Sequence, residues 1–269
     1  MKYFIILLFL TSFLNAKVYY SKVEPYETRD ISSNVTGVVK FIDEDMIGKK
    51  LSNKAYIKID AELDKKELKY LNLKLKELEK TVKVNEAILE NLKESLQRKQ
   101  INYKQIKDLK IKSRVEKDRE FYDLVASENS SLSTQKEINN LKVQIDDLKF
   151  RKAQLERSIS DKYLSDKGFV LYSIDVKVGQ VVNKATPLAK IADTSKALLT
   201  LYLDGEDLKD AKKKTIYIDG VKTPYKITRL LYIADAQNIS KYKAQIVVKA
   251  PKTFSKLVKI ELKEVDNAK

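Results

Sequence analysis

The sequence predicts an α+β fold in which a long helical hairpin interrupts a β domain and further strands follow. Three observations support this prediction. All six Gly and all four Pro residues lie outside residues 49–167, so this interval contains no helix breaker. Apolar residues recur within it at steps of three and four, as in a coiled coil. Short runs rich in Val, Ile and Tyr flank it on both sides, as expected for strands.

Residues 1–16 have the pattern of a secretory signal peptide. One Lys precedes an apolar run from Phe4 to Leu14, and Asn15 and Ala16 follow that run. The run is too short to span a bilayer, which requires about 20 residues. We therefore predict export and cleavage after Ala16, with an uncleaved, short inner-membrane anchor as the alternative.

The composition excludes several kinds of chemistry. The chain has no Cys, so disulfides, thiolate metal sites and a Cys-linked lipid anchor are excluded. It has no His, which removes a common metal ligand and the usual acid–base catalyst. Acidic residues in the helical interval are spaced as surface partners of Lys rather than as an enclosed catalytic pair. We expect a protein that is not an enzyme and has no catalytic residue, cofactor or metal.

The net charge of +15 raises the question of nucleic acid binding. An exported protein rarely meets nucleic acid, and a dense basic cluster lies within the helical interval, at residues 98–119. A basic patch at one end of a coiled coil suits an acidic protein or lipid surface. We therefore expect no nucleic acid partner.

The segments before the helices are predicted to form strands. Residues 17–31 alternate loosely and contain Pro25, which indicates one or two strands at the edge of a sheet formed with the C-terminal part of the chain. Residues 32–60 contain a strand around Gly37 and another that ends near Ile59, and we assign them to the first half of the interrupted β domain. Asp60 is expected to cap the helix that follows.

The helical hairpin is assigned to residues 61–165. In its first arm, Asn85 and Lys99 occupy the two positions of the seam that are not apolar. The apolar positions of this arm are Leu68, Leu71, Leu75, Leu78, Val82, Leu89, Leu92, Leu96, Tyr103 and Ile106. The return arm has a seam of Ile138, Leu141, Ile145, Leu148, Leu155 and Ile159. Nearer the tip, a shift of phase around residues 130–134 is needed to include Val115, Phe121 or Tyr122, Val125 and Leu132.

Two positions compete for the turn between the arms. Ser113 and Glu116 have the spacing of a capping box, and so do Thr134 and Glu137. A turn at residues 108–113 gives two arms of nearly equal length, which can pair along roughly 70 Å. A turn near residue 130 would leave much of one arm without a partner. We therefore place the tip at residues 108–113.

Strand patterns return after the helices. Residues 166–195 form the second half of the interrupted β domain, around Gly179. Residues 196–250 contain several short strands with turn signals, which predict a small β-barrel domain with a short helix at residues 205–213. Residues 251–269 are expected to add one or two C-terminal strands.

The order of these parts resembles the periplasmic adaptor subunits, or membrane fusion proteins, of bacterial efflux and secretion systems of the HlyD-like and RND types. In that family a lipoyl-like domain is split by a helical hairpin and followed by a β-barrel. Its two halves resemble residues 35–60 and 176–193 here, the second more closely than the first. The resemblance implies turns with positive φ at Gly37 and Gly179, and a reduced membrane-proximal part at residues 251–269.

The family's hairpin tip has a spaced set of residues that contact an outer-membrane channel. Its Arg position holds Asn102 in this sequence, so Lys104, Lys107 or Arg114 would have to supply the missing charge. The resemblance and the predicted turn together give a channel-contact site of Asn102, Ile106, Leu109, Lys110, Ser113, Glu116 and Asp118.

The resemblance also implies partners and a location. It implies a periplasmic adaptor, associated with the inner membrane through its partner, that links an inner-membrane transporter to a TolC-type outer-membrane channel for export of drugs or other small molecules. An RND transporter is favoured over an ABC transporter, and self-association, as a hexamer around the channel, is expected. Two alternatives stay open: an exported coiled-coil tether unconnected with transport and, ranked below it, a lipoyl- or biotin-type carrier subunit.

Overall fold

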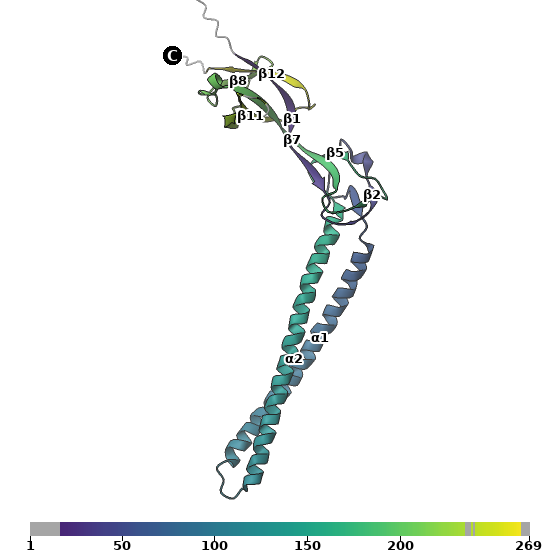
Figure 1. Cartoon of the computed structure of the whole chain (residues 1–269), viewed down its shortest axis with the longest axis vertical. Helices are drawn as coiled ribbons and strands as arrows, with labels where there is room; N and C mark the ends of the chain where they lie inside the picture. Colours follow the sequence, from purple (N-terminus) through teal and green to yellow (C-terminus); the bar gives the residue numbers. More distant parts are fainter. Residues whose placement is uncertain (1–16, 235–237, 239, 265–269) are drawn as a thin grey trace, which may run out of the picture.

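The structure is a computed structural model that describes residues 17–234, 238 and 240–264. The predicted signal peptide, residues 1–16, lies outside the described residues. Figure 1 shows a long hairpin of two helices that projects from one small β unit, with a second β unit at the opposite end of the molecule. Two long strands, β1 (Val18–Ser32) and β7 (Pro187–Asp204), run through both β units and connect them (Figure 1).

The hairpin consists of α1 (Glu62–Ile106) and α2 (Arg114–Asp161), which pack antiparallel (Figure 1). All ten apolar seam positions predicted for α1 are buried or half-buried, and so are Asn85 and Lys99. Asp60 Oδ1 accepts a hydrogen bond from the Glu62 N–H at 3.0 Å, although the N-cap position itself belongs to Ala61. In the described residues, no helical segment is both apolar enough and long enough to cross a membrane. Six buried residues form the hairpin core: Leu75, Val82, Leu89, Ile138, Leu141 and Ile145.

The seam of α2 keeps a single phase as far as residue 124, so the predicted phase shift near residues 130–134 is wrong. Leu132 is 60% exposed and Tyr122 is 69% exposed, whereas Ser131 is only 8% exposed. Hydroxyl side chains replace apolar ones here because they are small enough to be enclosed and can bond the preceding turn of their own helix, as Thr134 Oγ1 does with Ser130 O at 3.1 Å. The buried or half-buried seam positions are Leu124, Ser127, Ser131, Thr134 and Ile138.

The β unit that carries the hairpin, called here the split β unit, is built from segments on both sides of the helices. Its sheet has the order β4–β3–β2–β6, and β5 pairs separately with β7. One core combines Tyr56 and Ile59 from before the hairpin with Leu171 and Val182 from after it. The insertion of the hairpin in a single β unit is therefore confirmed. The elements are β2 (Gly37–Ile42), a 3-10 turn at Glu44–Met46, β3 (Ile57–Ile59), β4 (Tyr163–Leu164), β5 (Val170–Ile174) and β6 (Val181–Val182).

The two glycines predicted to form turns have different roles. Gly179 lies in a turn before β6 with φ of +87°, and its N–H donates to Val39 O at 2.8 Å. Gly37 is the first residue of β2 and is not among the residues with positive φ, so the prediction of a turn there is wrong. A Cβ at Gly37 would lie 2.7 Å from Ile59 Cγ2. Glycine is needed at this position because β2 approaches the side chain of Ile59 closely.

The other β unit, called here the terminal β unit, surrounds a second core formed by residues such as Tyr19, Leu201, Ile246 and Ile260. Its strand order is β10–β11–β7–β1–β12–β8–β9. In the described residues no pairing joins β10 to β9, so the closed ring of a barrel is not observed there. The predicted helix at residues 205–213 is confined to a 3-10 turn at Gly205–Leu208. The strands are β8 (Thr215–Ile218), β9 (Val221–Lys222), β10 (Arg229–Ala234), β11 (Lys241–Lys249) and β12 (Leu257–Lys263).

Strand β1 pairs with β12 through residues 18–22 and with β7 through residues 23–32, so Pro25 has a ladder partner on one side only, as expected for the predicted edge position. The prediction relied on Pro25, which cannot donate a hydrogen bond to a neighbouring strand. The pairing of β1 with β7 is also irregular between Pro25 and Glu27, as is common where a strand contains proline.

Candidate functional site at the hairpin tip

The seven residues of the predicted channel-contact site lie at the end of the hairpin farthest from both β units (Figure 1). Asn102 lies one turn before Ile106, which is the last residue of α1. Residues 107–113 connect the helices and include Leu109 and Lys110. The remaining three residues, Ser113, Glu116 and Asp118, form the N-cap and the first turns of α2.

The start of α2 is fixed by a capping box. Ser113 Oγ accepts from the Glu116 N–H at 3.3 Å, and Glu116 Oε2 accepts from the Ser113 N–H at 2.9 Å. Lys112 Nζ donates to Glu116 Oε1 at 3.1 Å. The hydrogen bonds that the Glu116 carboxylate accepts, from the Ser113 N–H first and then from Lys112 Nζ and the Ser113 hydroxyl, lower its pKa from 4.5 to about 2. The carboxylate is therefore charged at neutral pH and already bound to its own helix end.

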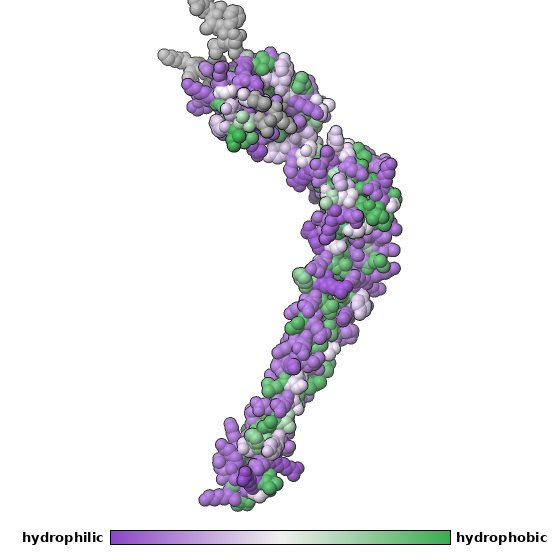
Figure 2. Space-filling model, viewed as in Figure 1, coloured by the Kyte–Doolittle hydropathy of each residue, from purple (hydrophilic) through white to green (hydrophobic). Residues whose placement is uncertain are grey.

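The connection between the helices exposes apolar and basic side chains together. Ile111 is 95% exposed and Leu109 is 46% exposed. Figure 2 shows hydrophobic surface at this end of the hairpin, surrounded by hydrophilic surface. Next to it, the Arg114 side chain is 94% exposed, and its Nε lies 3.8 Å from Asp118 Oδ2 in a pair too exposed to be strong. This combination suits docking by apolar packing and charge rather than catalysis.

The three candidate replacements for the family's Arg differ in their environments. Lys107 Nζ lies 4.0 Å from Asp108 Oδ2, and Arg114 pairs with Asp118. Lys104 is exposed and forms no ion pair within the described part of the chain. Of the three, Lys104 therefore has the charge that is most available to a partner.

Two features of the tip were not predicted from the sequence. The first is Ile111, which lies between two Lys residues of the predicted turn. Its large apolar side chain is exposed to solvent there, which is unfavourable unless a partner covers it. The second is an aromatic cluster, in which the Tyr103 and Phe121 rings are 5.7 Å apart and the Phe121 and Tyr122 rings are 5.9 Å apart. The contact between Tyr103 and Phe121 joins α1 to α2 just before the tip.

Within the described residues, no group of three or more acidic side chains is arranged to hold a metal ion.

The sequence matches no family model and no curated protein, but the structure is similar to solved structures. MacA from Actinobacillus actinomycetemcomitans is 17% identical and has a TM-score of 0.68 over 91% of this chain and 78% of that chain. The membrane fusion protein Spr0693 from Streptococcus pneumoniae R6 is 11% identical, with a TM-score of 0.57 over 93% of this chain and 99% of that chain. A MacA-MexA chimera that contains the Pseudomonas aeruginosa MexA α-hairpin is 15% identical, with a TM-score of 0.51 over 93% and 82%.

At these identities the likeness is one of fold, and it extends over nearly the whole chain rather than over the hairpin alone. It includes the insertion of two long helices between the halves of one β unit. The chain has the fold of the membrane fusion proteins.

Proposed function

We propose that the chain is a periplasmic adaptor that links an inner-membrane transporter to a TolC-type outer-membrane channel for the export of drugs or other small molecules. The observation that supports this most directly is the hairpin, whose helices of 45 and 48 residues carry a tip remote from both β units (Figure 1). At 1.5 Å per residue these helices reach roughly 70 Å. A spacer of this length with a docking surface at its end is suited to bridging two membranes.

The tip residues have distinct roles in this proposal. Leu109 and Ile111 pack into apolar recesses of the channel, while Lys104 and Lys110 meet acidic groups on it. Ser113 and Glu116 keep the end of α2 in shape, since their bonds to each other occupy their polar atoms. The adaptor itself performs no chemistry.

The terminal β unit faces the inner-membrane transporter in this proposal, with residues 251–269 as a reduced membrane-proximal part. An RND transporter is favoured over an ABC transporter as this partner. Six copies of the chain surround the channel. A photo-cross-linking residue at Lys222, which is exposed on β9, tests whether the terminal β unit faces the transporter. The captured protein shows whether the transporter belongs to the RND or the ABC class.

A photo-cross-linking residue at Lys110 tests the proposal in cells of the organism that carries the gene. The expected product is a covalent complex with an outer-membrane channel, identified by mass spectrometry. The same residue placed at Tyr172, which is 69% exposed on the split β unit, is the control and should not capture the channel. Capture at Lys110 of peptidoglycan or inner-membrane proteins only would favour the tether and contradict the adaptor.

Ser113→Arg tests the same site genetically. A long cation at the N-cap removes the capping hydroxyl and places positive charge at the positive end of the α2 dipole, so docking and export should be lost. Ser95→Arg, on an exposed position about three-quarters of the way along α1, is the matched control and should leave export unchanged. Normal export in the Ser113→Arg variant would rule out the tip as the contact site.

A further inference from the structure

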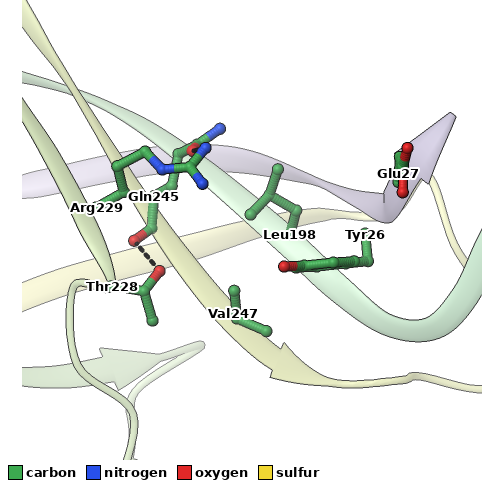
Figure 3. Close-up of a pocket in the computed structure, with 7 residues that line it drawn as sticks. All are labelled: Tyr26, Glu27, Leu198, Thr228, Arg229, Gln245 and Val247. Carbon is green, nitrogen blue, oxygen red and sulfur yellow. Dashed lines mark hydrogen bonds between the residues drawn. The ribbon is translucent and has the colours of Figure 1, made fainter.

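The terminal β unit contains a cavity of about 350 Å³ that has no role in the proposed link between transporter and channel (Figure 3). Its size is within the range of small-molecule sites. Strands β1, β7, β10 and β11 contribute its lining, which consists of Tyr26, Glu27, Leu198, Thr228, Arg229, Gln245 and Val247.

The cavity lies where the pairing of β1 and β7 is interrupted. Pro25 pairs with Ala197 and Glu27 pairs with Asp193, so Tyr26 has no partner in the ladder. The Tyr26 side chain is therefore free to form a wall of the cavity, and it is 42% exposed. Figure 3 shows Tyr26 near Leu198 and Val247, with Arg229, Gln245 and Thr228 grouped on the other side.

The cavity has an excess of positive charge. The carboxylate of Glu27 is neutralised, because Arg29 donates to both of its oxygens, from Nε at 2.7 Å and from Nη2 at 3.0 Å. Arg229 forms no ion pair with any described carboxylate. At the rim, the ammonium of Lys196 lies 5.8 Å from the centre of the Tyr26 ring, and the nearby carboxylate of Asp193 offsets its charge, so the excess positive charge is that of Arg229.

The guanidinium of Arg229 is held in place at one end only. Its Nη1 donates to Gln245 Oε1 at 3.2 Å, and the backbone of Gln245 is fixed in turn by the Thr228 hydroxyl, which donates to Gln245 O at 2.9 Å. A guanidinium has five N–H donors, so most of those of Arg229 are available to a ligand. Arginine in this arrangement is suited to a planar anionic group.

We propose that this cavity binds a small amphipathic anion, an aromatic or alkyl carboxylate or sulfonate. The apolar body of the ligand packs against Tyr26, Leu198 and Val247, and its anionic group accepts hydrogen bonds from Arg229. A cation is disfavoured because Glu27 is already bound by Arg29. The site is independent of the hairpin tip, so a failure of either proposal leaves the other standing.

Three probes that share one aromatic body test the proposal on the mature full-length chain: naphthalenesulfonate, the neutral naphthalenesulfonamide and naphthylmethylammonium. Titration by calorimetry or ligand-detected NMR should show one site that prefers the sulfonate. Arg229→Gln should weaken sulfonate binding by about tenfold, the value of one charge-assisted hydrogen bond, and should leave sulfonamide binding unchanged. Tyr26→Ala should weaken both, because it removes the apolar wall.

Two variants control for general effects of charge and of aromatic loss. Lys222→Gln removes one positive charge from an exposed position of β9 outside the cavity, and Tyr172→Ala removes an exposed ring from β5; both should bind the sulfonate as the unmodified chain does. An unchanged affinity in Arg229→Gln, an equal effect of Lys222→Gln, tighter binding of the ammonium, or no binding of the sulfonate would each overturn the proposal.

Discussion

The ammonium nitrogen of Lys162 lies 2.5 Å from Asp64 Oδ2 and joins the residue after α2 to the first turn of α1. The two side chains are only 9% and 22% exposed, respectively. In the described residues, Asp64 Oδ2 has no hydrogen-bond partner apart from this ammonium. The ion pair therefore holds the base of the hairpin closed at the point where both helices leave the split β unit.

Lys162→Met is expected to destabilise the chain by about 2 kcal/mol, because it leaves the Asp64 carboxylate partly enclosed without a counter-charge. Urea unfolding followed by far-UV circular dichroism measures the change. The double variant Lys162→Met with Asp64→Leu should recover most of the loss, since no charge then remains to be compensated.

Arg157→Met serves as the control for this prediction. Arg157 Nε lies 3.1 Å from Asp161 Oδ1, but its side chain is 76% exposed, so the loss should be below about 0.5 kcal/mol. A similar loss in Arg157→Met and Lys162→Met would show that enclosure of the pair is unimportant.

The capping box at the tip should respond to pH. The pKa of Glu116 is lowered from 4.5 to about 2 in the folded chain, so its contribution to stability is complete above pH 4.5 and is lost as the pH falls toward 2. Carboxyl NMR of the chain should show this low midpoint. Ser113→Ala removes the hydroxyl that bonds Glu116 and should raise the midpoint toward 4.5 while costing about 1 kcal/mol of stability. An unshifted midpoint in the unmodified chain would contradict the capping box.

Two neighbouring substitutions test the phase of the α2 seam. Ser131→Asp places a charge at a seam position that is 8% exposed and should destabilise the hairpin by about 2 kcal/mol. Leu132→Asp changes a residue that is 60% exposed and should cost no more than about 0.5 kcal/mol, although it removes a larger apolar side chain. Helical circular dichroism against urea distinguishes them. The reverse order of costs would support the phase shift that the sequence had suggested.

Gly37→Ala should destabilise the split β unit by about 1–3 kcal/mol, because the new Cβ would lie 2.7 Å from Ile59 Cγ2. Gly205→Ala is the matched control, since its Cβ would lie 3.7 Å from Tyr242 Cε2, an ordinary contact, and the change should be within about 0.5 kcal/mol. Denaturant unfolding measures both. If the two variants lose equal stability, close packing is not what requires glycine at position 37.

The sequence was most informative where a repeat is regular. Apolar residues recur through α1 with interruptions only at Asn85 and Lys99, and every predicted seam position of that helix is buried or half-buried. In α2 the apolar signal weakens toward the tip, because Ser127, Ser131 and Thr134 occupy the seam while Leu132 and Tyr122 point outward. The positions of the apolar residues alone therefore suggest a shift in the phase of the seam, although the seam of α2 has no such shift.

In the rest of the chain, features that depend on neighbouring residues could be predicted from the sequence, and features that depend on distant residues could not. The capping box of Ser113 and Glu116 depends on four consecutive residues and could be recognised from them. The pairing of β1 with β7 and β12 depends on partners at least 155 residues away, and no pattern within β1 specifies them. The exposure of Ile111 likewise follows from where the turn points and not from the turn sequence.

Strand β1 has a further consequence for the order in which the chain matures. It is made first among the described elements, yet its partners β7 and β12 are made late, and residues 18–22 remain an open edge until residues 257–261 exist. The two helices of the hairpin pair only with each other, so they can pair before the partner strands of β1 have been made. The molecule is thus completed from the middle outward, and loss of the final strand would release the beginning of the chain while sparing the hairpin.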